Sequence, residues 1–260
     1  MSWRQTVPRV VGVVGAAGQM GAGIAEVLER VAGCRVVRHD IAGGSTGGWE
    51  AVREAEFIIE AVPESLSVKQ SVFDVLEGAG CLRDGVVLAS NTSSISITKL
   101  AALTPRPEQF IGMHFFNPVP RMEVVEVVCG LQTSAATLAR TEALAQAMGK
   151  QPARCVHDSP GFVSNRVLMP YINEAVETLR EGVASRDDID RIMKLGTRVP
   201  MGPLALADFI GLDTCLAIMR VLEAGLPGGG ARYKPSPLLV KYVDAGWLGR
   251  KTKRGFYEYP

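Results

Sequence analysis

The sequence of 260 residues is poor in cysteine and histidine and has no long apolar run. Its cysteines are widely spaced and form no Cys-x-x-Cys pair, which argues against a zinc site or a disulfide framework and is typical of a reducing compartment. We therefore predict no metal centre. No apolar run approaches the roughly 20 residues that a membrane-spanning helix needs. The five cysteines are Cys34, Cys81, Cys129, Cys155 and Cys215.

The sequence also lacks a net excess of positive or negative charge. The 28 basic residues nearly balance 27 acidic ones, and no block of like charge occurs, so neither a nucleic-acid nor a membrane partner is predicted. The first five residues, Met-Ser-Trp-Arg-Gln, lack the apolar core of a signal peptide. We therefore expect a cytoplasmic protein.

Strand and helix patterns alternate through the first half of the chain, and helical patterns alone fill the second half. This order predicts an α/β class: a Rossmann-like, doubly wound, mostly parallel sheet, followed by an all-helical C-terminal domain. We predict domains at 1–157 and 158–260. The helical half carries more apolar residues than one small bundle needs, which favours a homodimer interface there. The predicted strands cover residues 9–14, 34–39, 57–62, 86–89, 110–113 and 153–156.

A glycine turn follows the first predicted strand. Gly15, Gly18 and Gly21 form Gly-x-x-Gly-x-x-Gly, one residue longer than the usual Gly-x-Gly-x-x-Gly. Such a turn presents backbone N–H groups and a helix N-terminus to a pyrophosphate, although tight turns also need glycine for steric reasons alone. Asp40 ends the second strand, where a carboxylate accepts the ribose hydroxyls of NAD and repels the 2′-phosphate of NADP. The longer turn and two nearby arginines leave NADP as an alternative.

His114 follows the short apolar run 110–113, which places it at the carboxyl end of a strand, where open α/β sheets hold their ligands. A histidine that acts as a base needs a partner on its second ring nitrogen. Glu126, in the next apolar run, is the candidate. The alternative is a surface histidine beside an unrelated glutamate, and the neighbouring cofactor motif favours the first reading.

Taken together, these residues resemble the L-3-hydroxyacyl-CoA dehydrogenase family over nearly the whole chain. Seven motifs occur in the family's order and at nearly its spacing. They are Gly18–Gly21, Ile59–Glu64 with Lys69, Ser90–Ser94, His114–Pro120 with Glu126, Asp158–Arg166, Met201–Pro203 with Gly211–Asp213, and Gly249–Tyr257.

The resemblance implies reversible, NAD-dependent oxidation of a 3-hydroxyacyl-CoA thioester to a 3-oxoacyl-CoA thioester, as in β-oxidation and fatty acid metabolism. It implies that His114 is the base and Glu126 its paired acid. Ser93 and Asn165 resemble the residues that hold the substrate oxygens, and Asn117 resembles a support for the histidine. A dimer formed through the helical domain is also implied. The cofactor-binding residues expected from the glycine turn and the resemblance are Gly15, Ala17, Gly18, Gln19, Met20, Gly21, Asp40, Ala61, Glu64, Lys69, Asn91 and Lys251.

One departure from the family bears on the substrate. The family has a long helical arm between the second and third strands that contributes to coenzyme A binding, whereas here only residues 41–56 are available, including the glycine-rich segment 43–48. This segment is either a natural loss or an engineered splice. The short arm motivates one alternative function, the same chemistry on an acyl-carrier-protein thioester or a free 3-hydroxy acid. The other alternative is a non-enzymatic NAD-binding dimer.

Overall fold

The computed structural model describes residues 7–30, 34–40 and 48–260. The chain forms two compact units, Met1–Phe162 and Val163–Pro260, compared with the boundary at 157/158 predicted from the sequence. Most of the glycine-rich segment lies outside the described residues.

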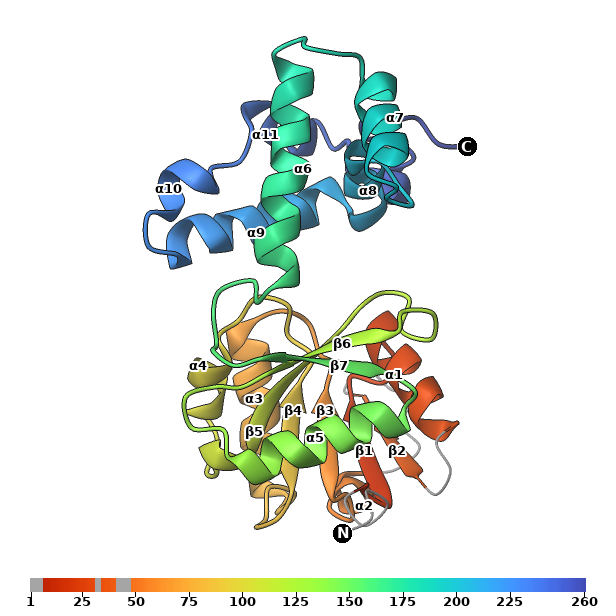
Figure 1. The fold of residues 1–260 in the computed structure, drawn as a ribbon. Helices are drawn as coiled ribbons and strands as arrows, with labels where there is room; N and C mark the ends of the chain where they lie inside the picture. Colours follow the sequence, from red (N-terminus) through yellow and green to blue (C-terminus); the bar gives the residue numbers. More distant parts are fainter. Residues whose placement is uncertain (1–6, 31–33, 41–47) are drawn as a thin grey trace. The chain divides into compact units, whose positions relative to one another are not determined.

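The first unit contains a seven-stranded sheet of order β2-β1-β3-β4-β5-β6-β7 (Figure 1). All neighbouring strands pair in parallel except β5 and β6, which are antiparallel. That exception follows from the short connection 116–123, because parallel neighbours need a longer crossover. The predicted mostly parallel, doubly wound sheet is confirmed. The strands are β1 (Val10–Val14), β2 (Arg35–His39), β3 (Phe57–Glu60), β4 (Val87–Ser90), β5 (Phe110–Phe115), β6 (Val124–Val128) and β7 (Gln151–Cys155).

Helices cover both faces of this sheet, as parallel strands require. One face packs against α1 and α5, and the other against α2, α3 and α4. Valine and isoleucine dominate the strands because β-branched side chains pack well on a pleated surface that is buried on both sides. The helices are α1 (Gln19–Glu29), α2 (Trp49–Val52), α3 (Leu66–Gly78), α4 (Ile97–Ala101) and α5 (Ala135–Ala147), with a 3₁₀ turn η2 (Pro107–Gln109).

The second unit is all helical, as predicted, and has its own apolar core. Asp208 is almost completely buried there and pins the C-terminal segment by accepting hydrogen bonds from the amides of Phe256 and Tyr257 and from the hydroxyl of Tyr259. The helices are α6 (Ser164–Arg180), α7 (Arg186–Gly196), α8 (Pro203–Ile210), α9 (Leu212–Gly225), α10 (Gly229–Arg232) and α11 (Pro237–Asp244), followed by η3 (Arg250–Thr252).

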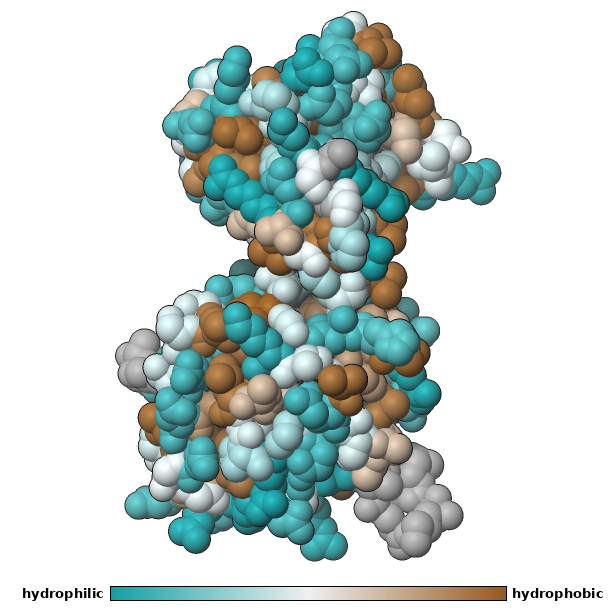
Figure 2. All heavy atoms as spheres, turned by 90° about the vertical axis from the view of Figure 1, so that its left-hand side faces the viewer, coloured by the Kyte–Doolittle hydropathy of each residue, from teal (hydrophilic) through white to brown (hydrophobic). Residues whose placement is uncertain are grey.

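Large apolar side chains also reach the surface of the helical unit. Figure 2 shows apolar residues at several places on one side of this unit, among hydrophilic ones. The exposed fractions of Ile192 and Leu195, both on α7, are 62% and 70%. Among the described residues, no helix combines the length and the apolarity that crossing a membrane requires.

Candidate active site

His114 and Glu126 form a buried pair. They lie directly opposite each other in the antiparallel β5–β6 register, and opposite residues of such a pair project to the same face of the sheet. The Nδ1 atom of His114 is 2.7 Å from Oε2 of Glu126. Because a carboxylate only accepts hydrogen bonds, Nδ1 carries the proton and Nε2 presents its lone pair. The two side chains are 11% and 5% exposed, so little water competes for this contact.

Two aromatic rings and a thiol lie close to the pair. The ring of Phe116 lies 4.8 Å from the His114 ring and that of Phe162 lies 5.9 Å away, measured between centroids. The Sγ atom of Cys155, at the end of β7, is 3.9 Å from Oε1 of Glu126. The carboxylate of Glu126 thus contacts the imidazole with one oxygen and a thiol with the other.

The glycine turn links β1 to α1 through close backbone contacts. A Cβ atom added to Gly15, whose φ is +86°, would meet the carbonyl group of Ala61 at 2.7 Å, and one added to Gly21 would meet the Gly15 oxygen at 2.1 Å. A Cβ at Gly18 would come no nearer than 3.4 Å to other atoms. Gly15 and Gly21 are therefore required by packing, whereas the side of Gly18 stays open.

This turn fits the diphosphate of a dinucleotide. The N-cap residue of α1 is Gly18, which has no side chain to cap the first turn, and this turn begins with Gln19 and Met20. A helix N-terminus of this kind offers N–H donors and a partial positive charge to an anion. Gly18 provides the open approach that a phosphate needs. Contact of the predicted glycine-turn residues with the diphosphate of NAD stays a prediction.

Asp40 follows β2 and faces the same turn. Its Oδ2 accepts a hydrogen bond of 2.9 Å from the amide of Ala17, one of the two residues between the first two glycines. The longer turn therefore helps to orient this carboxylate. The nearby arginines both bind carboxylates of the protein, Arg38 with Glu29 at 2.8 Å and Arg35 with Glu54.

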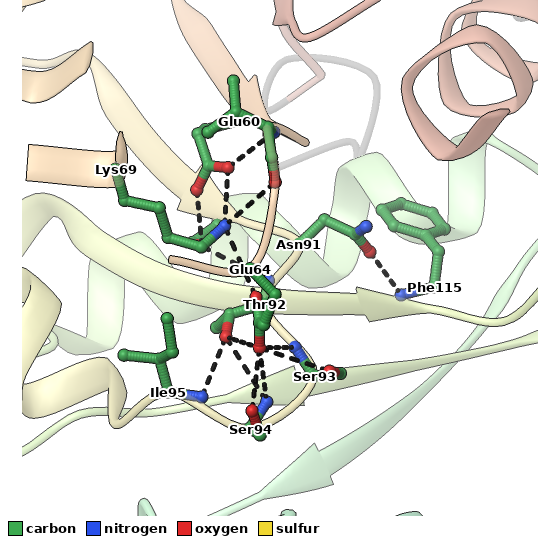
Figure 3. Close-up of polar contacts among 11 residues, drawn as sticks. Glu60, Glu64, Lys69, Asn91, Thr92, Ser93, Ser94, Ile95 and Phe115 are labelled. Atoms are coloured by element: carbon green, nitrogen blue, oxygen red, sulfur yellow. Dashed lines mark hydrogen bonds and ion pairs between the residues drawn. The ribbon is translucent and has the colours of Figure 1, made fainter. Parts of the chain in front are cut away.

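Glu64 holds the loop that follows β4 (Figure 3). Its Oε1 accepts hydrogen bonds from the amides of Ser93 and Ser94, both at 2.9 Å, and from the hydroxyls of Thr92 at 2.7 Å, Ser94 at 3.0 Å and Ser93 at 3.2 Å. Burial alone would raise the pKa of Glu64. The charge of Lys69 and the hydrogen bonds from the loop outweigh burial, so the net effect lowers this pKa.

Lys69, predicted to bind the cofactor, lies in α3 beneath this loop, and its side chain is completely buried. Its Nζ is 2.7 Å from Oε1 of Glu60, which is also fully buried, and 3.6 Å from Oε2 of Glu64. Ser90 donates to the other oxygen of Glu60 at 2.7 Å. The chain Ser90–Glu60–Lys69–Glu64 therefore joins the ends of β3 and β4. Figure 3 shows Glu60, Lys69 and Glu64 in this chain.

The remaining predicted residues divide between the units. Asn91 accepts a hydrogen bond of 2.9 Å from the amide of Phe115 and so ties the end of β4 to β5. Asn117 is exposed in the β5–β6 connection. In the helical unit, Asn165 lies in the first turn of α6, and Lys251, in η3, binds Asp213 at 2.6 Å.

Sequence reasoning missed several polar residues near the site. Glu60, Thr92 and Ser94 belong to motifs that the sequence singled out, but nothing in the pattern indicated that they form one hydrogen-bonded network. The contact between Cys155 and Glu126 had no sequence signal, because 29 positions separate the two residues. Only the pairing of β6 with β7 brings them together.

The lowered pKa of Glu64 leads to a prediction about stability. A carboxyl whose folded-state pKa lies below its ordinary value of 4.5 contributes stability above that value, and the contribution is lost as the pH falls through the folded-state pKa. We expect Glu64→Gln to flatten the acid limb of the stability profile below about pH 5. Urea unfolding at several pH values between 7 and 3, followed by circular dichroism, measures this.

Glu77→Gln is the matched control, since Glu77 is an exposed residue near the end of α3. It should leave the acid limb as steep as in the wild type. Equal slopes for the two variants would show that Glu64 makes no special contribution at low pH.

Comparisons with known proteins agree with this geometry. Residues 43–159 match the family model for the 3-hydroxyacyl-CoA dehydrogenase NAD binding domain, and residues 161–259 match the model for the C-terminal domain of the same family. The chain is 46% identical to the 3-hydroxybutyryl-CoA dehydrogenase of Bradyrhizobium diazoefficiens over 97% of its own length and 96% of that protein.

Two further relatives are similar. The probable 3-hydroxybutyryl-CoA dehydrogenase of Bacillus subtilis is 55% identical over 81% of this chain and 71% of that protein. The crystal structure of (S)-3-hydroxybutyryl-CoA dehydrogenase from Ralstonia eutropha superimposes with a TM-score of 0.91 at 44% identity, covering 97% of this chain and 99% of that one. With a dinucleotide-binding sheet, a helical second unit and matches of this extent, the chain belongs to the NAD-dependent 3-hydroxyacyl-CoA dehydrogenase family.

Proposed function

We propose that this protein interconverts 3-hydroxyacyl-CoA and 3-oxoacyl-CoA thioesters, with His114 as the general base. The buried contact of 2.7 Å between His114 Nδ1 and Glu126 Oε2 carries this proposal. Imidazole exchanges protons readily near neutral pH, which suits a base acting on a substrate hydroxyl. The names of the relatives support the substrate class.

The cofactor and the residues of the protein have separate roles in this reaction. Bound NAD⁺ supplies the chemistry of hydride acceptance. The glycine turn and Asp40 would hold its diphosphate and ribose. His114 takes the hydroxyl proton on Nε2, and the negative charge of Glu126 favours the imidazolium that results. In the reverse direction the imidazolium returns this proton to the substrate oxygen.

Ser93 would orient the substrate. Oε1 of Glu64 receives five donors, whereas one carboxylate oxygen has about two lone-pair sites. The Ser93 hydroxyl makes the longest of these contacts, 3.2 Å, and is therefore the donor that most easily turns to a substrate oxygen. The resemblance assigns Asn165 the other substrate-holding role, and a kcat or KM defect in Asn165→Ala would test that assignment. Lys69, having no exposed surface, would act on the cofactor site through Glu64.

The decisive assay is the oxidation of NADH, followed by its absorbance, with acetoacetyl-CoA as substrate. We expect turnover to 3-hydroxybutyryl-CoA. NADH binding without turnover of this or any other 3-oxoacyl thioester would favour the non-enzymatic alternative instead.

The carrier of the acyl group is a separate question, motivated by the short arm. Contacts to a carrier far from the reacting carbon strengthen ground-state and transition-state binding alike, so their loss raises KM more than it lowers kcat. We therefore expect a small KM difference between acetoacetyl-CoA and the truncated pantetheine thioester. A carrier-protein thioester, assayed in parallel, tests the alternative substrate. A much lower KM for the coenzyme A thioester than for the pantetheine thioester would show that other residues bind the rest of coenzyme A.

Cofactor choice gives a further prediction. The wild type should prefer NADH over NADPH by on the order of 10²-fold in kcat/KM, because an uncompensated like-charge contact costs several kcal/mol and each 1.4 kcal/mol is tenfold. Asp40→Ala should narrow this ratio by removing the repelling carboxylate. Steady-state kinetics with both cofactors measures it, and equal use of both by the wild type would contradict the role of Asp40.

We also propose a homodimer formed through the helical unit and a cytoplasmic location. Exposed apolar residues such as Ile192 and Leu195 support the interface, and analytical ultracentrifugation tests it. All five cysteines are thiols and none is in a disulfide, which supports a reducing compartment; fractionation of the source cells tests this location.

A further inference from the structure

Lys150 is a buried lysine outside the predicted site. It directly precedes β7, is 7% exposed, and donates hydrogen bonds to the main-chain carbonyls of Val119 at 2.6 Å and Met122 at 2.7 Å. Lysine is almost never buried unless it is paired. The buried ammonium group of Lys150 is therefore expected to have a specific structural role.

The contacts of Lys150 differ from those of an ordinary ion pair. Both hydrogen-bond partners of Lys150 within the described chain are carbonyl oxygens rather than carboxylates. Burial accordingly lowers the pKa of Lys150, and Glu123 opposes this only in part. Hydrogen bonds from a charged donor are roughly twice as strong as neutral ones, so the two contacts offset the cost of removing the ammonium group from water. The same two hydrogen bonds hold the backbone of one turn in place.

The fastened turn joins the two strands of the His114–Glu126 pair. Within it, the Pro118 carbonyl accepts hydrogen bonds from the amides of Arg121 and Met122, and Lys150 engages two other carbonyls of the same segment. The next residue, Gln151, donates from its main-chain amide to the main-chain carbonyl of Glu123 at 2.7 Å. Gln151 also begins the pairing of β7 with β6. Lys150 thus joins the 118–123 turn to the start of the edge strand.

The same turn packs against the cofactor-binding helix. Val119 is 2% exposed, and a Cβ atom added to Gly23 of α1 would lie 3.0 Å from the Val119 Cβ. Helix and turn are therefore in close contact, and a side chain added at Gly23 would require Val119 to shift by a few tenths of an ångström. A displacement of Val119 would be transmitted both to the strand that carries His114 and to the helix whose N-terminus would face the cofactor diphosphate.

We propose that Lys150 is a positioning residue that fixes the β5–β6 turn and so holds the His114–Glu126 pair in register with the cofactor-binding helix. This inference rests on the proposed dehydrogenase function for its kinetic consequence, but the fastening of the turn can be measured without activity. Lys150 touches neither substrate nor reacting atoms in this role; it acts through the backbone of residues 118–123.

The test compares Lys150→Met, Lys150→Arg and the control Lys99→Met, since Lys99 is an exposed lysine of α4. We expect Lys150→Met to lower kcat for acetoacetyl-CoA by ~10–10²-fold, the range for a small misplacement of catalytic groups. KM should change far less, because the contacts to the coenzyme A part of the substrate are unchanged. Lys150→Arg, which keeps the charge and the donors, should recover most of kcat, and Lys99→Met should match the wild type.

Two measurements without turnover complete the test. Hydrogen exchange of the amides in 116–123 should accelerate in Lys150→Met relative to Lys99→Met, and NADH should bind Lys150→Met more weakly than the wild type. A well-folded Lys150→Met with wild-type exchange and wild-type kcat overturns the proposal. If Lys150→Met does not fold, Lys150→Gln is used in its place. If neither variant folds, Lys150 contributes to stability alone, and the proposal is overturned. An inactive wild type refutes the proposed function, while the exchange rates still decide the role of Lys150.

Discussion

Replacement of His114 by glutamine is expected to lower kcat for acetoacetyl-CoA reduction by ~10²–10⁴-fold, the usual contribution of a positioned acid–base group. Glutamine keeps a polar side chain of similar length but cannot carry a proton between substrate and solvent at neutral pH. NADH binding should persist, because the glycine turn and Asp40 belong to other strands. Stopped-flow or steady-state absorbance gives kcat, and quenching of protein fluorescence gives NADH affinity.

His157→Gln is the matched control, because His157 is an exposed histidine that follows β7. It should leave kcat at the wild-type value. Glu126→Gln should also lower kcat, since an amide at this position removes the negative charge that favours the imidazolium and permits the wrong tautomer. A His114→Gln enzyme with near-wild-type kcat on a verified substrate would show that another group is the base.

Replacement of Lys69 by methionine is expected to destabilise the first unit by ~3–5 kcal/mol, because removing one partner leaves the other charge buried and uncompensated. Both side chains of the Lys69–Glu60 pair are completely buried. Methionine keeps the apolar stem of lysine and so confines the change to the ammonium group. Urea unfolding followed by circular dichroism, with hydrogen exchange of β3 as the local probe, measures the loss.

The double variant Glu60→Gln with Lys69→Met separates this effect from simple loss of packing. Removing both charges should recover much of the stability, because a buried pair replaced as a whole is often neutral. Lys99→Met, at an exposed lysine of the same unit, should change stability little. Equal losses in the single and double variants would show that the ion pair is not what stabilises this region.

Local features of the chain are read well from the sequence. The glycine turn, the runs of β-branched residues and the helical periodicity predicted the sheet, its mostly parallel order and the helical second unit, and the structure confirms them. Each depends on neighbouring residues: glycine allows the positive φ of Gly15, and side-chain periodicity decides which face is buried. Asp40, at the end of β2, was placed by the same kind of reasoning.

Contacts between distant segments were decided by the tertiary structure. The sequence named His114 and Glu126, but their contact follows from the antiparallel register of β5 and β6. The sequence also named Lys69, whereas its complete burial between Glu60 and Glu64 follows from the packing of α3 against the sheet. Lys150 carried no signal at all, because its partners lie 28 and 31 positions away. Propensity and periodicity are properties of a segment, whereas the partner of a buried charge depends on which segments the sheet order and the apolar core bring together.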